Sequence, residues 1–140
     1  MATLGELMNT TVVTAAAGDS VASAAAAMVA AGVGSAVVLQ GTFLAGILTE
    51  RDVLRAAASA EDLRQSLVSD WMTSDPTALG PDAPAEEAAQ VMLLSGFRHL
   101  PVVEGRDVRG VVSLRDLFAA RIRREAAKGA DPPAPGWSPE

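Results

Sequence analysis

Residues 46–52, GILTERD, occur a second time as GVVSLRD at residues 110–116, 64 positions later. In each copy, three uncharged residues that can form a strand precede a hydroxyl residue, Thr49 or Ser113, at the position of a helix N-cap. An aspartate, Asp52 or Asp116, follows three positions later, in the first turn of the predicted helix. Each copy therefore predicts a strand that turns directly into a helix.

The repeat extends well beyond these two corners, because the offset of 64 holds without a gap from near the N-terminus to residue 116. The matching pairs include Met8 and Met72, Met28 and Met92, Gly32 and Gly96, Val38 and Val102, and Gly41 and Gly105. One supersecondary unit is thus used twice. A unit of roughly 55 residues buries too little surface to be comfortably stable alone, so we expect both copies to pack into one globule.

Composition excludes several classes of site. The chain has 140 residues, of which 49% are hydrophobic and 20% charged, as in a folded globular domain. It has no cysteine and one histidine, which excludes disulfides and thiolate nucleophiles and argues against a metal site. No Ser-His-Asp or Cys-His constellation is available. We therefore expect neither enzymatic activity nor a required cofactor.

Charge argues against two kinds of partner. The net charge of −6 disfavours nucleic acid, and we interpret the basic cluster at residues 121–124 as a solvated face. Residues 20–49 carry no charge, but the equivalent window of the second copy contains Glu86, Glu87, Arg98 and His99, which argues against a membrane span. Without a basic N-terminal region there is no sign of a secretory signal, and we expect a cytoplasmic protein.

Local patterns predict the order strand, helix, strand, strand, helix in each copy, preceded by a short helical lead. Residues 1–60 form the first repeat, residues 61–128 the second, and residues 129–140, with four prolines, a disordered tail. In the first repeat we expect the lead at 3–8, strands at 11–14, 35–39 and 44–48, and helices at 20–31 and 51–59. In the second we expect the lead at 67–72, strands at 77–79, 100–103 and 108–112, and helices at 84–95 and 114–128. The result is an α+β fold in which two small sheets, related by a pseudo-twofold, face each other.

These features resemble a known family. The order of elements, the lead ending in Met, the run GFRHLPVV at 96–103 and the two Gly-x-x-[Thr/Ser]-x-x-Asp corners are similar to a tandem pair of cystathionine-β-synthase (CBS) domains, the Bateman module. The resemblance covers residues 3–127. It implies a stand-alone CBS protein whose inter-repeat cleft holds adenosine nucleotides or derivatives at two pseudo-equivalent sites.

Carried over residue by residue, the resemblance implies two sites of different composition. At the first, Asp116 binds the ribose hydroxyls, Ser113 contacts ribose or phosphate, and Arg98, His99 and Arg115 meet phosphate, opposite Thr10, Val13, Val33 and Gly34. The second uses Thr49, Arg51 and Asp52 with Gly34 and Ser35, opposite Ser74, Thr77, Phe97 and Arg98. Gly34-Ser35 stands where the other repeat has Arg98-His99, so we expect the Asp52 site to lack two cations and the Asp116 site to prefer phosphorylated ligands.

Structural roles would also explain the same residues. Thr49-x-x-Asp52 and Ser113-x-x-Asp116 fit capping boxes in which Asp replaces the usual Glu or Gln, and capping and ligand binding can coexist. His99 would suit a phosphate contact or a half-exposed strand position. The two corner arginines, Arg51 and Arg115, would also serve to pair with acids on their own helices. Each of these alternatives stays open at the level of sequence.

The resulting hypothesis is a regulatory module that binds AMP, ADP, ATP or a related adenosyl metabolite and signals to an effector protein. The family commonly dimerises through helical faces, so we expect a homodimer. The alternative is a dimerisation or interaction scaffold whose clefts bind no ligand. Asp52 and Asp116 distinguish the two hypotheses, because only a sensor loses ligand binding when they are replaced.

Overall fold

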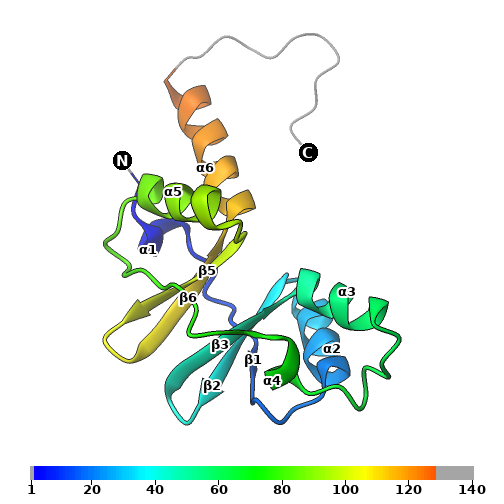
Figure 1. The fold of residues 1–140 in the computed structure, drawn as a ribbon. Coiled ribbons are helices and arrows are strands. Elements are labelled where there is room, and N and C mark those ends of the chain that lie inside the picture. Colours follow the sequence, from blue (N-terminus) through cyan, green and yellow to red (C-terminus); the bar gives the residue numbers. More distant parts are fainter. Residues whose placement is uncertain (1, 129–140) are drawn as a thin grey trace, which may run out of the picture.

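The computed structural model describes residues 2–128, and the predicted tail at 129–140 lies outside the described residues. The first half of the chain contains α1 (Leu4–Leu7), β1 (Thr14–Ala15), α2 (Val21–Ala31), β2 (Ser35–Gln40), β3 (Phe43–Thr49) and α3 (Glu50–Ala58). The second half repeats this order as α4 (Val68–Trp71), β4 (Thr73–Ser74), α5 (Ala85–Ser95), β5 (His99–Glu104), β6 (Asp107–Ser113) and α6 (Leu114–Ala127). Figure 1 shows the two hairpins between the helix pairs α2–α3 and α5–α6. No helix within residues 2–128 is long and apolar enough to cross a membrane.

Local signals account for the helix ends. Ser20 caps α2 by accepting a hydrogen bond from the backbone N–H of Ser23 at 3.1 Å. Both Gly32 and Gly96 end their helices in the left-handed conformation, with φ of 69° and 80°. Their positive φ explains why the helices stop where the sequence predicts.

The two sheets have the same plan. In the first, the order is β1-β2-β3-β4, with β1 parallel to β2 and the other pairs antiparallel. The second sheet contains β5 and β6, which single bridges extend on both sides, from Leu79 to Val102 and from Asn9 to Val111. The pairing shifts register after Val38 in one hairpin and after Val102 in the other. These positions are equivalent in the repeat, so the pseudo-twofold extends to irregularities of the sheets.

The lead segments are exchanged between the repeats. Leu4 is fully buried in a cluster that otherwise belongs to the second repeat and includes Leu100 and Val112. Val68 is fully buried in the cluster of the first repeat, which includes Met28 and Leu48. Equivalent backbone bonds hold the leads in place: Leu4 N–H donates to Ala83 O and Val68 N–H donates to Asp19 O, both at 2.9 Å. Each hydrophobic core is therefore completed by a segment from the other half of the chain.

A glycine allows each lead to lie against its strand. A Cβ atom at Gly46 would lie 2.6 Å from Met72 Sδ and 2.8 Å from the carbonyl oxygen of Thr73. At Gly110 it would lie 2.8 Å from both Met8 Sδ and the carbonyl oxygen of Asn9. Backbone oxygens cannot yield as flexible side chains do. The glycine that begins each corner motif is thus required for the exchange of leads.

The opposite faces of the sheets cover each other. Side chains alternate between the two faces of a strand, so Val37 points away from its neighbours Ala36 and Val38, which belong to the core under α2. Val37 is nevertheless fully buried, as is Pro101 at the equivalent position of β5. This burial indicates that the sheets face each other, as the sequence predicts.

Two predicted strands are shorter in the structure. The run at 11–14 gives only the two-residue strand β1, and the strand predicted at 77–79 is a single bridge at Leu79. Both segments lie at a sheet edge, where few backbone pairings form. Pro84, predicted in the first turn of its helix, is instead the N-cap residue of α5.

Replacing the corner glycines tests the role of their close contacts. We expect Gly46→Ala and Gly110→Ala each to lower the free energy of unfolding by about 1–3 kcal/mol, because the added methyl overpacks a backbone contact. Gly18→Ala is the control, since no atom lies within 4 Å of its Cβ position and its φ is not in the left-handed region. Urea unfolding measures all three. Equal effects at the three positions would show that the close contact is not limiting.

Candidate functional site

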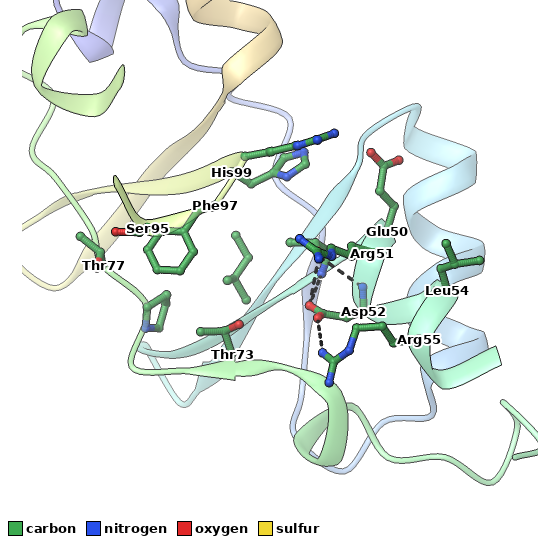
Figure 2. A pocket seen from close by; sticks show the side chains of 15 residues that line it. Glu50, Arg51, Asp52, Leu54, Arg55, Thr73, Thr77, Ser95, Phe97 and His99 are labelled. Atoms are coloured by element: carbon green, nitrogen blue, oxygen red, sulfur yellow. Dashed lines mark hydrogen bonds and ion pairs between the residues drawn. The ribbon is translucent and has the colours of Figure 1, made fainter. Parts of the chain in front are cut away.

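Two pockets lie between the repeats, each of about 880 Å³. Such volumes fall in the usual range of small-molecule sites, about 300–1,000 Å³. We name them the Asp52 pocket and the Asp116 pocket. Each combines the corner of one repeat with the segment between the first long helix and the next strand of the other repeat. Figure 2 shows the Asp52 pocket, with Asp52 and Arg55 on one side and Thr77 and Phe97 on the other.

The Asp116 pocket brings together most of the residues predicted for it. They are Asp116, Ser113, Arg115, Arg98, His99, Val13, Val33 and Gly34. Thr10 lines neither pocket, whereas Asn9 and Thr11 on either side of it line this one. The sequence also missed Phe118, Val29 and Asn9.

The Asp52 pocket contains Thr49, Arg51, Asp52, Thr77, Phe97 and Arg98, as predicted. Gly34 and Ser35 were expected here but line the Asp116 pocket, and Ser74 lines neither. The reason is the pseudo-twofold, which places the corner of each repeat opposite residues 32–35 or 96–99 of the other repeat. Phe97 thus offers the Asp52 pocket an aromatic face where the Asp116 pocket has Val33.

The expected shortage of cations in the Asp52 pocket is wrong. Arg98 and His99 line both pockets, because the segments that begin β2 and β5 meet at their junction. Gly34 makes this meeting possible, since a Cβ atom there would lie 2.9 Å from His99 Nε2. The Asp52 pocket also contains Arg55, which the sequence analysis did not consider. A preference of the Asp116 pocket for phosphate therefore has no support from the number of cations.

Both corners form complete capping boxes. Asp52 Oδ2 accepts a hydrogen bond from the backbone N–H of Thr49 at 2.9 Å, and Asp116 Oδ2 accepts one from Ser113 N–H at 2.9 Å. In return, the hydroxyl of each cap accepts from the backbone N–H of its aspartate, at 3.4 Å and 3.1 Å. The structural role considered from the sequence is present at both corners. It uses one carboxylate oxygen and leaves the other available for further contacts.

The second oxygen distinguishes the two aspartates. Asp52 is buried, and its Oδ1 accepts a hydrogen bond from Arg55 Nη1 at 3.2 Å. Asp116 is half-buried, and within residues 2–128 its Oδ1 accepts no hydrogen bond. The residue equivalent to Arg55 is Ala119, which cannot make this contact. Of the two corner aspartates, Asp116 is therefore the one with a carboxylate oxygen that accepts no hydrogen bond within residues 2–128.

Arg55 is held by a second contact besides Asp52. Its guanidinium lies 5.6 Å from the ring centroid of Trp71, in cation–π geometry. Trp71 in turn donates its indole N–H to Glu61 Oε2 at 3.2 Å. The equivalent of Trp71 in the first lead is Leu7, so the second repeat has no counterpart of this arrangement.

His99 lies at the junction of the pockets and is half-buried. Burial lowers the pKa of its imidazole below the ordinary value of 6.5. The positive charge of Arg98 acts in the same direction, while the carboxylates of Glu50 and Asp116 partly oppose it. The side chain is therefore neutral at pH 7, when one ring nitrogen donates a hydrogen bond and the other accepts one.

The corner arginines remain available to a ligand. Within residues 2–128, neither Arg51 nor Arg115 forms an ion pair, so the pairing with neighbouring acids suggested by the sequence is not found. The same part of the chain contains no group of three side chains suited to a metal ion. What the two pockets offer is hydrogen-bonding carboxylates, guanidinium groups and apolar walls.

Comparison with known proteins explains this arrangement. The model of the CBS domain matches residues 4–59 and 68–123. The CBS domain-containing protein YhcV of Bacillus subtilis is 32% identical over 131 residues, which cover 93% of each chain. A 17.7 kDa protein of Acidianus ambivalens is 37% identical over 91 residues, and this match spans 54% of its length.

Solved structures share the fold. That of the CBS domain protein NE2398 has a TM-score of 0.80 and 30% sequence identity, covering 86% of this chain and 97% of that one. The CBS domain pair of protein MJ0100, solved in complex with 5′-methylthioadenosine and S-adenosyl-L-methionine, has a TM-score of 0.81 at 21% identity and covers 89% of this chain and 98% of that one. Together with the two matched segments, these likenesses show that the chain belongs to the CBS domain family and contains a tandem CBS pair.

Proposed function

We propose that this CBS pair is a regulatory module that binds an adenosine-containing ligand between its repeats. The observation that carries the proposal is the free Oδ1 of Asp116 beside a pocket of about 880 Å³. A carboxylate oxygen in that position can accept hydrogen bonds from a ribose diol. Val13 and Val33 supply an apolar wall for the base, and Arg98 and Arg115 can meet a phosphate. That the MJ0100 pair binds adenosyl ligands supports the same class of ligand here.

Regulation follows from the position of the pockets. A ligand in either pocket contacts both repeats, so it favours the relative orientation of the repeats to which it binds more tightly. The proposed output is a change in the surface offered to an effector protein or to a second copy of the chain. No catalytic step is part of this proposal.

A specific observation also favours self-association. The exposed apolar side chains on the helices include four that recur between the repeats, namely Val29 (83%), Leu93 (84%), Leu54 (69%) and Phe118 (65%). Val29 and Leu93 are equivalent in the repeat, as are Leu54 and Phe118. A twofold dimer uses the same surface patch of both copies, so apolar side chains that recur in both repeats can pack against their counterparts in a second copy. Three of the four also line a pocket, which would connect ligand binding to the dimer.

Thermal unfolding with ligands tests the sensor function. We expect at least one of adenosine, AMP, ATP, 5′-methylthioadenosine and S-adenosylmethionine to raise the midpoint by several degrees, since saturation to about 100 times Kd adds about 2.7 kcal/mol. The double variant Asp52→Asn/Asp116→Asn should lose the shift, whereas Asp82→Asn, at an exposed position outside both pockets, should keep it. No shift in the wild type, or an equal shift in the double variant, would contradict the proposal.

Molar mass in solution tests the dimer. We expect light scattering after gel filtration to give about twice the mass of the chain. Val29→Glu/Leu93→Glu should give a monomer, because it places charge in the centre of an apolar interface. Thr42→Glu, in an exposed hairpin turn, is the control and should leave the dimer intact. A wild-type monomer, or a double variant that remains dimeric, would exclude this face as the interface.

A further inference from the structure

The two pockets differ most where Arg55 contacts Asp52. We propose that Arg55 makes the Asp52 pocket a site for an anionic phosphoryl group, while the Asp116 pocket takes the uncharged ribose diol. Where the anion belongs to a nucleotide, this inference rests on the function proposed above. It reverses the preference expected from the sequence, because the carboxylate that could receive a diol is engaged in one pocket and free in the other.

Both carboxylate oxygens of Asp52 already accept hydrogen bonds. Its Oδ2 accepts from the backbone N–H of Thr49 at 2.9 Å and from the Thr49 hydroxyl at 3.1 Å. Its Oδ1 accepts from Arg55 at 3.2 Å, and the Asp52 side chain is only 9% exposed. A carboxylate has about four acceptor positions, and three of those on Asp52 are already used. A diol that uses both hydroxyls would therefore have to displace a bond, and the charge-assisted one from Arg55 is stronger than the bond that a neutral hydroxyl would offer in its place.

Arg55 itself remains able to bind an anion. A guanidinium carries five N–H donors, and within residues 2–128 Asp52 is the acceptor that Arg55 contacts. Its side chain is 59% exposed and lines the pocket. Stacking on Trp71 limits its motion, so little further entropy is lost when it binds an anion.

Other cations converge on the same space. Arg51 and Arg98 also line the Asp52 pocket, and within residues 2–128 neither forms an ion pair. Figure 2 shows Arg51 and Arg55 on the same side of the pocket, near Asp52. The carboxylate of Glu50 lines both pockets, so its repulsion of an anion does not distinguish them. Three guanidinium groups thus face the Asp52 pocket, compared with those of Arg98 and Arg115 in its twin.

Binding measured at each pocket by amide NMR shifts tests the assignment. Thr49 and Arg51 report on the Asp52 pocket, and Ser113 and Arg115 on the Asp116 pocket. We expect adenosine to shift the Asp116 reporters, and inorganic phosphate to shift the Asp52 reporters. AMP separates two sources of the anion: a lower Kd than that of phosphate at the Asp52 reporters indicates a nucleotide, and an equal Kd indicates a free oxyanion.

Variants then test Arg55 directly. Arg55→Ala should weaken phosphate and AMP at the Asp52 pocket by about tenfold, the loss expected for a charge-assisted hydrogen bond, and leave adenosine at the Asp116 pocket unchanged. Arg109→Ala removes a surface arginine paired with Glu104 and is the matched control. Ala119→Arg should weaken adenosine binding at the Asp116 pocket, because it supplies that aspartate with the same competing partner.

The outcomes separate this inference from the proposed function. If phosphate binds at the Asp52 pocket through Arg55 but no adenosine-containing ligand binds at either pocket, the anion assignment stands and the nucleoside function fails. If adenosine-containing ligands bind and Arg55→Ala leaves the affinity of AMP and phosphate unchanged or raises it, the anion assignment is overturned and the function stands. Adenosine binding at the Asp52 reporters as tightly as at the Asp116 reporters would also overturn the assignment.

Discussion

The contact on which the structure depends most is the close approach of each lead to a strand of the other repeat. It occurs at Gly46 and Gly110, where the carbonyl oxygens of Thr73 and Asn9 would lie 2.8 Å from a Cβ atom. Because the leads are exchanged, neither core is complete without the other half of the chain. This mutual dependence holds the corners and the segments that they face in a common arrangement, and the two pockets result from it.

The capping boxes connect helix formation with the chemistry of the pockets. The bonds that fix Asp52 and Asp116 to their N-cap residues also determine which carboxylate oxygen is left over. A flexible aspartate would lose side-chain entropy on binding a ligand, whereas a capped one is already ordered before the ligand arrives. Helix capping and ligand binding are therefore compatible uses of the same carboxylate.

Much of the fold was predictable because one offset of 64 residues relates its two halves. Helix ends at Gly32 and Gly96 and the two hairpins follow from local signals, and the structure confirms them. The edge strands were overestimated, since β-branched residues favour an extended chain without determining how many pairings it makes. The exchange of leads involves contacts between distant residues such as Leu4 and Leu100, which a repeat pattern does not specify.

The repeat also made part of the site predictable. The repeat locates both corners, but it does not show that Arg98 and His99 reach both pockets, because that depends on how the repeats meet. Arg55 lies three residues after Asp52, outside the corner motif. It was missed because the equivalent residue of the other repeat is Ala119, so the repeat does not mark this position. The fold constrains the glycines and the capping residues in both halves, whereas side chains that only face a pocket are free to differ. Differences between the two pockets should therefore be sought at such positions: Arg55 corresponds to Ala119 in the repeat, and Phe97 corresponds to Val33.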